Sequence, residues 1–284
     1  MKSLIHVALA ALLIASLPAA AEDPFGKVLL LTKSGGFQHE PVAEKDGQPS
    51  QAELVLKEVL AKQGLQVDAT KDAGKINAAE LEHYKLVIFY TQGDLDKEGI
   101  DKTPMGPDGM KDLNAWIDAG GGFMGFHSAT DTSRPATADD PNTPYTAMIG
   151  GAFAGHGKQF RGTIKVVDPK HPAIASVPDG FSIPDEWYVF HHLDTKNIHV
   201  LALLDPGDER KNQEMYNVPN YPAVWCKTQG KGRIFYSAMG HRPDVWTNET
   251  FLAMVRDAAN WATGKTDLKA DPNYDKAVGE HAHH

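Results

Sequence analysis

Four histidines of this chain stand where side-chain chemistry is possible: His39, His127, His156 and His241. Imidazole changes its protonation near neutral pH, so it can serve as general base, general acid or metal ligand. His39, His127 and His241 each lie in a segment that directly follows a predicted strand. Because ligands of open parallel sheets bind beyond the carboxyl ends of the strands, we expect these histidines to converge in space.

The segment around His127 gives the most specific signal. In the segment GGFMGF (residues 121–126), an apolar strand predicted at 123–126 ends directly before His127, and Ser128 follows. A strand that enters a tight, glycine-flanked turn projects one side chain at the sheet edge, as in a nucleophile elbow. The pattern predicts that His127 is that side chain and acts as general acid or base or as a metal ligand. The alternative is a histidine that is hydrogen-bonded for structure only.

Carboxylates and aromatic rings near these histidines suggest a polar ligand. Glu186 lies in residues 185–188 (DEWY), and Asp131 follows His127 closely. We predict that His127, Glu186 and Asp131 take part in catalysis. Carboxylates and amides beside aromatic rings suit a sugar, whose C–H faces stack and whose hydroxyls form hydrogen bonds. The predicted substrate-binding residues are His39, Gln92, Asp94, Trp187 and Tyr188. An amphipathic strand is the competing interpretation of residues 185–188.

A metal site is a further hypothesis for the same residues. The sequence has no short zinc motif such as H-E-x-x-H. A convergent set of His39, His127, His156 and His241, with Glu186 as the carboxylate, would still suit a divalent metal such as zinc with an open position. The sequence itself requires no cofactor.

Other histidines and the single cysteine are interpreted as structural. His171 precedes Pro172 and shapes a turn, whereas the adjacent His191 and His192 point to different sides if extended, so at most one would join a site. Cys226 has no partner for an internal disulfide and lies in an apolar run, where a buried small hydrophobe is expected.

Strands alternate with helices along the first half of the chain. Strands are predicted at residues 27–33, 66–69, 85–90 and 123–126, and helices at 50–63 and 107–119. The second half adds strands at 160–167, 197–204, 221–228 and 233–237 and a helix at 251–263. Such alternation predicts an α/β fold with a mainly parallel sheet and helices on both faces.

The two ends of the chain differ from this pattern. Lys2, the apolar run of residues 4–17 and the small residues 18–21 are typical of a secretory signal peptide cut after Ala21. The run is short for a transmembrane anchor, the alternative, so we expect an exported protein, periplasmic or secreted, with no stable membrane insertion after cleavage. Residues 265–284 are expected to be a polar, frayed tail.

Charge limits the partners. The net charge of −9 and the absence of a basic stripe in the sequence argue against a nucleic-acid partner, because phosphate binding requires clustered Lys and Arg. A small-molecule carbohydrate is the expected partner, and the oligomeric state stays open.

Several motifs together resemble one known family in order and spacing. They are residues 36–40 (GFQHE), 120–127 (GGGFMGFH), 151–156 (GAFAGH), 185–188 (DEWY), 221–225 (YPAVW) and 230–241 (GKGRIFYSAMGH). The chain resembles the ThuA-like (trehalose utilisation) domain family over residues 27–264. The resemblance implies a single domain with a flavodoxin-like sheet, as in class I glutamine amidotransferases. It also implies a role in the use of trehalose and related disaccharides, acting on oxidised (keto) sugars.

The sequence departs from amidotransferases at both key positions. His127 stands where they carry the nucleophilic cysteine, and Pro243 stands where the late His-x-Glu pair would place its glutamate. Glutamine hydrolysis through a thioester is therefore not expected. Two functions remain: hydrolase, lyase or isomerase chemistry on a keto-disaccharide or glycoside, or a non-catalytic exported carbohydrate-binding or scaffold module.

Overall fold

The computed structural model describes residues 26–281. The predicted signal peptide, residues 1–21, lies outside this part of the chain. No helix within residues 26–281 is both long and apolar enough to cross a membrane.

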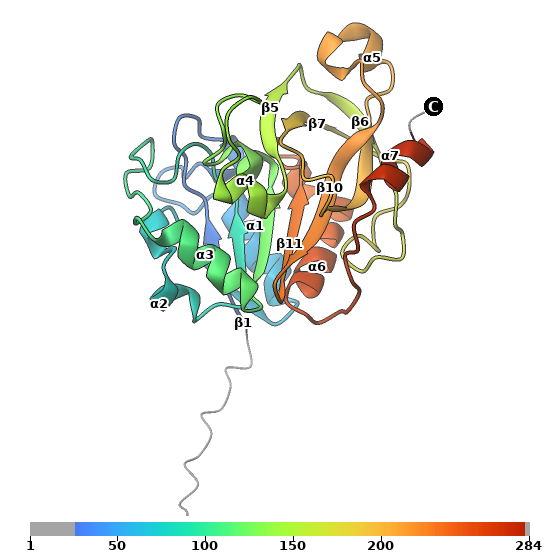
Figure 1. Cartoon of the computed structure of the whole chain (residues 1–284). Helices are drawn as coiled ribbons and strands as arrows, with labels where there is room; N and C mark the ends of the chain where they lie inside the picture. Colours follow the sequence, from blue (N-terminus) through green and yellow to red (C-terminus); the bar gives the residue numbers. More distant parts are fainter. Residues whose placement is uncertain (1–25, 282–284) are drawn as a thin grey trace, which may run out of the picture.

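One large sheet organises the described chain, with the strand order β2-β1-β3-β4-β11-β10-β9-β6-β7 (Figure 1). Its first half is parallel and consists of β2 (Leu65–Thr70), β1 (Gly26–Leu31), β3 (Leu86–Phe89), β4 (Gly122–Phe126) and β11 (Gly232–Ser237). Every residue of β3 and β4 is buried, as expected for parallel strands covered on both faces. The predicted α/β, flavodoxin-like fold is confirmed.

The second half of the sheet is antiparallel. It consists of β10 (Tyr221–Gln229), β9 (His199–Asp205), β6 (Phe160–Val166) and β7 (Phe181–Asp185). A tight turn joins β10 to β11, with Gly230 at φ +56°, a conformation that glycine adopts without strain. The sheet is therefore mixed, and only its first half has the predicted parallel pairing.

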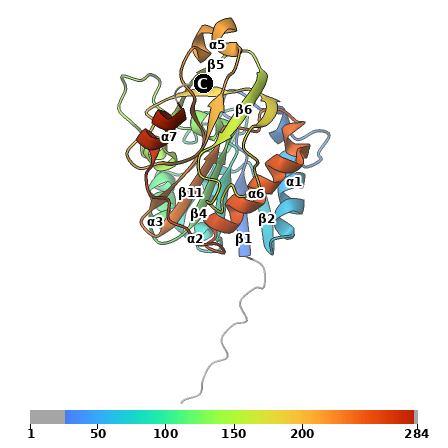
Figure 2. The same cartoon turned by 90° about the vertical axis from the view of Figure 1, so that its right-hand side faces the viewer.

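Helices cover both faces of the parallel half (Figure 2). The helices α1 (Gln51–Ala61) and α6 (Glu249–Ala262) lie on one face, and α2 (Ala78–Leu81), α3 (Gly109–Asp118) and α4 (Pro144–Ile149) lie on the other. Ser50 caps α1 by accepting a hydrogen bond from the backbone N–H of Glu53. Short 3-10 turns occur at Glu40–Val42, Ala73–Lys75, His127–Asp131, Glu214–Tyr216 and Val245–Thr247.

A small two-stranded sheet lies near the end of the parallel half where its strands finish. It pairs β5 (Ala152–His156) with β8 (Tyr188–His191) in antiparallel fashion, so that His156 lies opposite Tyr188. The sequence did not predict β5, because its glycines and alanines are as typical of a turn. The short helix α5 (Glu209–Asn212) projects beyond this end of the molecule (Figure 1).

The C-terminal tail is not frayed as expected. It contains helix α7 (Tyr274–His281), and Ala270 and Ala277 are buried. The Asn273 side chain hydrogen-bonds both the N–H and the carbonyl of Val200 in β9, at 2.6 and 3.0 Å. Because these contacts satisfy backbone groups of the sheet, they hold residues 270–277 against it.

Candidate active site

His127 occupies the predicted elbow at the end of β4. Its backbone is left-handed, with φ +42°, and its side chain is fully buried. Such a backbone is unusual for a residue other than glycine and is often retained at functional sites. Its carbonyl accepts hydrogen bonds from the Tyr236 hydroxyl at 2.8 Å and the Thr130 hydroxyl at 3.3 Å. These bonds fix the turn that aims the imidazole.

The tautomer of His127 follows from its partner. Nδ1 lies 3.0 Å from the carbonyl oxygen of Ala238, which can only accept a hydrogen bond, so Nδ1 carries the proton. In the neutral form of this tautomer, Nε2 presents its lone pair to the neighbouring side chains. Metal-binding histidines are commonly oriented in this way by a backbone carbonyl.

Four side chains converge at this point: His39, His127, His241 and Glu186. One nitrogen or oxygen atom from each lies within 4.8 Å of the other three. His241 Nδ1 is 3.2 Å from both His127 Nε2 and Glu186 Oε1, and Glu186 Oε1 is 3.6 Å from His127 Nε2. The His39 ring centroid lies 4.9 Å from that of His127 and 5.2 Å from that of His241. We call this set the histidine cluster.

Gln92 positions His39. The side-chain oxygen of Gln92 accepts hydrogen bonds from the N–H groups of Gly36 and Phe37, at 2.9 and 2.8 Å. This holds the loop after β1 over the end of β3, and His39 follows as the residue before the turn that starts at Glu40. The amide of Gln92 thus has a structural task, although it also lines the cavity beside the cluster.

Asp185 positions His241. Its buried carboxylate accepts the N–H of Gly240 at 2.7 Å and the N–H of Arg242 at 3.2 Å, so it holds the backbone on both sides of His241. The Gly240 carbonyl accepts from the Tyr90 hydroxyl at 2.6 Å, and Gly240 has φ +127°. Burial raises the pKa of Asp185, against the influence of His127 and the bond from Gly240. From the sequence, Asp185 was identified only as part of the motif DEWY, and no role was predicted for it.

The electrostatics of the cluster suit lone-pair donors. Burial, and then the neighbouring His127 and His241, lowers the pKa of His39 to about 2, so its imidazole stays neutral. Burial alone would raise the pKa of Glu186, but the hydrogen bonds and charges of His127 and His241 outweigh it and hold that pKa below its usual range. The neutral imidazole of His39 and the ionised carboxylate of Glu186 are donors of the kind that divalent zinc and related metals prefer.

His156 lies beside the cluster and outside its tight group of four. From β5, its Nδ1 lies 3.2 Å from Glu186 Oε2 and 2.9 Å from the Gly157 carbonyl oxygen, and 41% of its side chain is exposed. It therefore contacts the free oxygen of Glu186 and faces the solvent side. This placement favours a role in proton transfer or substrate contact over the metal-ligand role predicted for it.

A cavity of about 410 Å³ opens above the cluster. It is lined by Phe37, His39, Gln92, Asp131, Phe153, His156, Glu186, Tyr188 and His241. We call it the histidine hollow. Three of the four predicted histidines line it, and the buried His127 lies directly behind the lining, with its ring centroid 4.1 Å from that of Tyr188. The four predicted histidines therefore lie at one place. Phe37 and Phe153 were given no role from sequence, although both lie in motifs noted there, GFQHE and GAFAGH.

Three predicted site residues lie elsewhere or are otherwise engaged. Trp187 is fully buried and donates its N–H to the Phe160 carbonyl at 3.1 Å, so its predicted contact with substrate is wrong. Asp94 lines a neighbouring cavity and not the histidine hollow. Asp131 lines both, but its carboxylate binds Arg134 and the side-chain nitrogen of Gln92.

Within residues 26–281, His171, His191, His192 and Cys226 do not line the histidine hollow. His191 and His192 contact each other through their Nδ1 atoms and do not line it. Cys226 is buried in β10, as expected, with Sγ 3.7 Å from His171 Nε2.

Solved structures with the same fold cover most of this chain. A structure of a ThuA-like protein from Bacteroides uniformis ATCC 8492 matches with a TM-score of 0.65 and 22% identity, covering 90% of this chain and 99% of that one. One from Parabacteroides merdae ATCC 43184 matches with a TM-score of 0.60 and 17% identity, covering 88% and 95%. At such low identities, the TM-scores show a shared fold.

The fold also occurs inside a larger enzyme. A beta-galactosidase from Bacillus circulans sp. alkalophilus matches with a TM-score of 0.51 and 12% identity, covering 88% of this chain but 32% of that one. The comparison with curated protein sequences gave no match. A family model for ThuA, described as trehalose utilisation, matches residues 27–262. The chain therefore belongs to the ThuA family.

Proposed function

We propose that this protein is a carbohydrate-acting enzyme whose centre is a divalent metal, such as zinc, held by the histidine cluster. The observation that carries the proposal is the convergence of three imidazoles and one carboxylate within 4.8 Å at the base of an open cavity. The family description, trehalose utilisation, supports a sugar as the substrate. An oxidised (keto) disaccharide or glycoside is the substrate that we propose.

The residues around the cluster suit proton transfer next to a sugar ketone. A metal bound there would supply a Lewis acid that polarises the ketone oxygen. The Nδ1 atom of His156 faces the Gly157 carbonyl and Glu186, so its Nε2 is left to take a proton from the adjacent carbon or hydroxyl. The electron pair of the broken C–H bond moves toward the ketone oxygen. This step is common to lyase and isomerase reactions, and the same groups could activate water for hydrolysis.

The aromatic side chains complete the site. Phe37, Phe153 and Tyr188 line the histidine hollow, and Phe37 is 55% exposed at its rim. Such faces suit the C–H surface of a pyranose ring. The pKa of Tyr188 is raised well above its usual range by burial, so its hydroxyl stays protonated and can donate a hydrogen bond to a sugar oxygen.

Metal analysis of the purified full chain tests the proposal. We expect one divalent ion per chain, lost in His127→Ala and retained in His83→Ala, a control at an exposed histidine far from the cluster. Trehalose oxidised to a ketone should be turned over by the wild type and not by His127→Ala or after chelation. Equal metal content in the wild type and His127→Ala would contradict the metal centre.

Turnover also separates the enzyme from the non-catalytic alternative. A carbohydrate-binding module would bind the oxidised disaccharide in the wild type and consume none of it. That result, with metal bound, would replace the proposed enzyme by a metal-dependent sugar-binding protein.

Export is a separate part of the proposal and rests on residues 1–21 alone. Expression of the full chain in a bacterium with a periplasm should give a product that begins at Glu22. N-terminal sequencing of the recovered protein checks this, and an intact cytoplasmic product would contradict it.

A further inference from the structure

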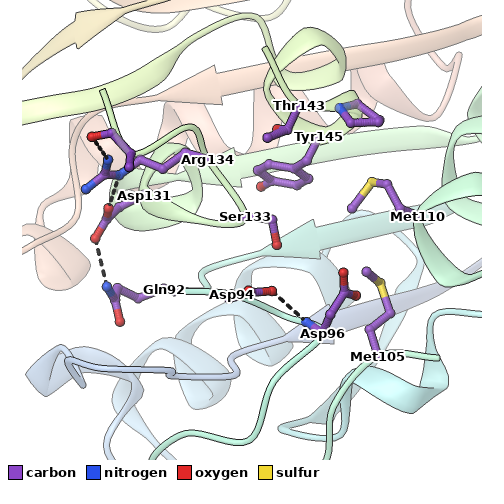
Figure 3. A pocket seen from close by; sticks show the side chains of 13 residues that line it. Gln92, Asp94, Asp96, Met105, Met110, Asp131, Ser133, Arg134, Thr143 and Tyr145 are labelled. Atoms are coloured by element: carbon purple, nitrogen blue, oxygen red, sulfur yellow. Dashed lines mark hydrogen bonds and ion pairs between the residues drawn. The ribbon is translucent and has the colours of Figure 1, made fainter. Parts of the chain in front are cut away.

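A second cavity adjoins the histidine hollow. It has a volume of about 590 Å³ and is larger than the first (Figure 3). We infer that it is a second subsite, which takes an uncharged polyhydroxyl unit of the substrate and rejects anionic units. The inference rests on the proposed function, because it assumes that the reacting unit sits at the histidine cluster. We call this cavity the acidic hollow.

The two hollows meet at one pair of side chains. Gln92 and Asp131 line both, and the Gln92 amide donates to the Asp131 carboxylate at 2.8 Å. Gln92 follows β3 and Asp131 ends the 3-10 turn after β4, so the pair stands at the carboxyl edge of two neighbouring strands. A ligand that reaches beyond the histidine hollow across this pair enters the acidic hollow. The combined site therefore has room for two linked units, each in a cavity of ordinary ligand-binding size.

The lining of the acidic hollow is two-sided (Figure 3). Tyr145, Met110 and Met105 form an apolar side at the right of the view, and the carboxylates of Asp94 and Asp96 lie between them and Gln92. An apolar surface opposite a few polar groups matches a pyranose, which has a C–H face and a rim of hydroxyls. Carboxylates accept hydrogen bonds only, so they bind hydroxyl hydrogens well.

The charges of the acidic hollow select against anions. Three of its lining side chains are carboxylates, from Asp94, Asp96 and Asp131, and one is the guanidinium of Arg134. Arg134 is already engaged, since it donates to Asp131 and, at 3.0 Å, to the carbonyl of Pro135. Asp94 is also paired, with Lys97 at 2.7 Å, so Asp96 is the lining carboxylate for which the described residues supply no ion pair. A phosphate or carboxylate on the second unit would meet this negative charge. Specificity often rests on such repulsion against the wrong ligand.

The position of Asp131 changes its expected role. Both of its carboxylate oxygens are used, one by Arg134 and one by Gln92, which in turn holds the loop that carries His39. Asp131 is thus a positioning residue at the boundary of the two hollows. In the arrangement that we infer, Asp131 holds Gln92 and Arg134 in place and does not take part in catalysis as the sequence predicted.

Calorimetric titration of the metal-loaded full chain with trehalose and with glucose tests the subsite. We expect trehalose to bind at least about tenfold more tightly than glucose. Ala136→Trp places an indole in the acidic hollow from an exposed position of its lining, away from the histidine cluster. It should remove the advantage of trehalose and leave glucose affinity unchanged. Ala136→Phe, a smaller block, should reduce the advantage partly.

Trehalose 6-phosphate tests the charge selection. The wild type should bind it at least about tenfold more weakly than trehalose. The double variant Asp94→Asn/Asp96→Asn should bind trehalose 6-phosphate more tightly than the wild type does, with trehalose affinity changed less. Trehalose 6-phosphate affinity that the double variant does not raise would overturn the selection.

These results separate the inference from the function on which it rests. Equal metal content in the wild type and His127→Ala would remove the proposed metal centre, whereas a preference for trehalose over glucose that Ala136→Trp abolishes would still support the second subsite. An Ala136→Trp variant that keeps its metal and still binds trehalose better than glucose would overturn the second subsite alone.

Discussion

Two groups of histidines in this molecule look alike by ring distance and differ in where their nitrogens point. In the histidine cluster, ring centroids lie 4.9–5.2 Å apart. On the antiparallel half of the sheet, the ring centroids of His171 and His199 lie 5.1 Å apart. Proximity of imidazoles therefore does not identify a site by itself.

The nitrogens of the second pair are used by the scaffold. His199 contacts the Asp271 carbonyl at 2.6 Å through Nδ1 and the Asp168 carboxylate at 3.1 Å through Nε2. His171 accepts the N–H of Ala173 at Nδ1 and faces the buried Cys226 thiol at Nε2. In the histidine cluster, by contrast, one nitrogen of each ring faces the other ligand atoms. Lone pairs that converge without a backbone partner distinguish a binding centre from a structural pair.

The largest expected effect comes from removing the charge in the histidine cluster. Glu186→Gln keeps the size of the side chain and loses the anion that balances a divalent cation. We expect metal affinity to fall by at least about 100-fold, measured by competition with a chromogenic chelator. The matched change in the second group, Asp168→Asn, removes the carboxylate partner of His199 and should leave metal affinity unchanged. Equal losses in both variants would erase the distinction between the two groups.

The parallel topology explains how far the sequence predicts this cluster. His39, His127 and His241 follow different strands, and the carboxyl ends of parallel strands meet at one edge, so their convergence follows from the strand order alone. The pairing of β5 with β8, which brings His156 to Glu186, is long-range and is not encoded in any local pattern.

Trp187 shows a second limit of the sequence. Along the extended stretch that leads into β8, successive side chains alternate in direction, so Glu186 and Tyr188 face the histidine hollow and Trp187 faces the core. The motif DEWY shows that successive side chains face opposite sides. It does not show which of them face the sheet edge and which face the core. That choice is made by the packing of Trp187 against Phe160 and Gly162 of β6, which are distant from it in sequence.

A substitution at Asp185, which holds the backbone on both sides of His241, should have an intermediate effect on metal affinity. Asp185→Asn removes the buried charge that accepts the N–H groups of Gly240, Arg242 and Glu186 and leaves one side-chain oxygen to serve all three. We expect a loss of about 3 kcal/mol in the free energy of unfolding, measured with urea. Because His241 is then less well placed, metal affinity should fall by about 10- to 100-fold. Asp244→Asn, at an exposed carboxylate that pairs with Arg242, is the control and should change neither quantity measurably.

The smallest expected effect tests the structural character of the second group through pH. Burial, and then the neighbouring His199, lowers the pKa of His171 to about 4, against the opposing influence of Asp168; Arg233 adds to the lowering. The pKa in the unfolded chain is about 6.5. Between these values the unfolded state binds more protons than the folded state, so the free energy of unfolding decreases as pH falls from about 6.5 to 4.

Protonation of His171 accounts for a decrease on the order of 2 kcal/mol in the free energy of unfolding as pH falls. Above pH about 6.5 His171 causes no such decrease. His171→Gln retains an acceptor for the Ala173 N–H and cannot be protonated, so its unfolding free energy should depend less on pH over this range. Urea titrations of both proteins at several pH values measure the difference, and metal content, which His171 does not touch, should be the same in both. Parallel curves would mean that the pKa of His171 is the same in the folded and the unfolded chain, so that burial does not keep its imidazole neutral. The neutral state inferred for the His171 imidazole would then be wrong, although its contacts with Ala173 and Cys226 would remain.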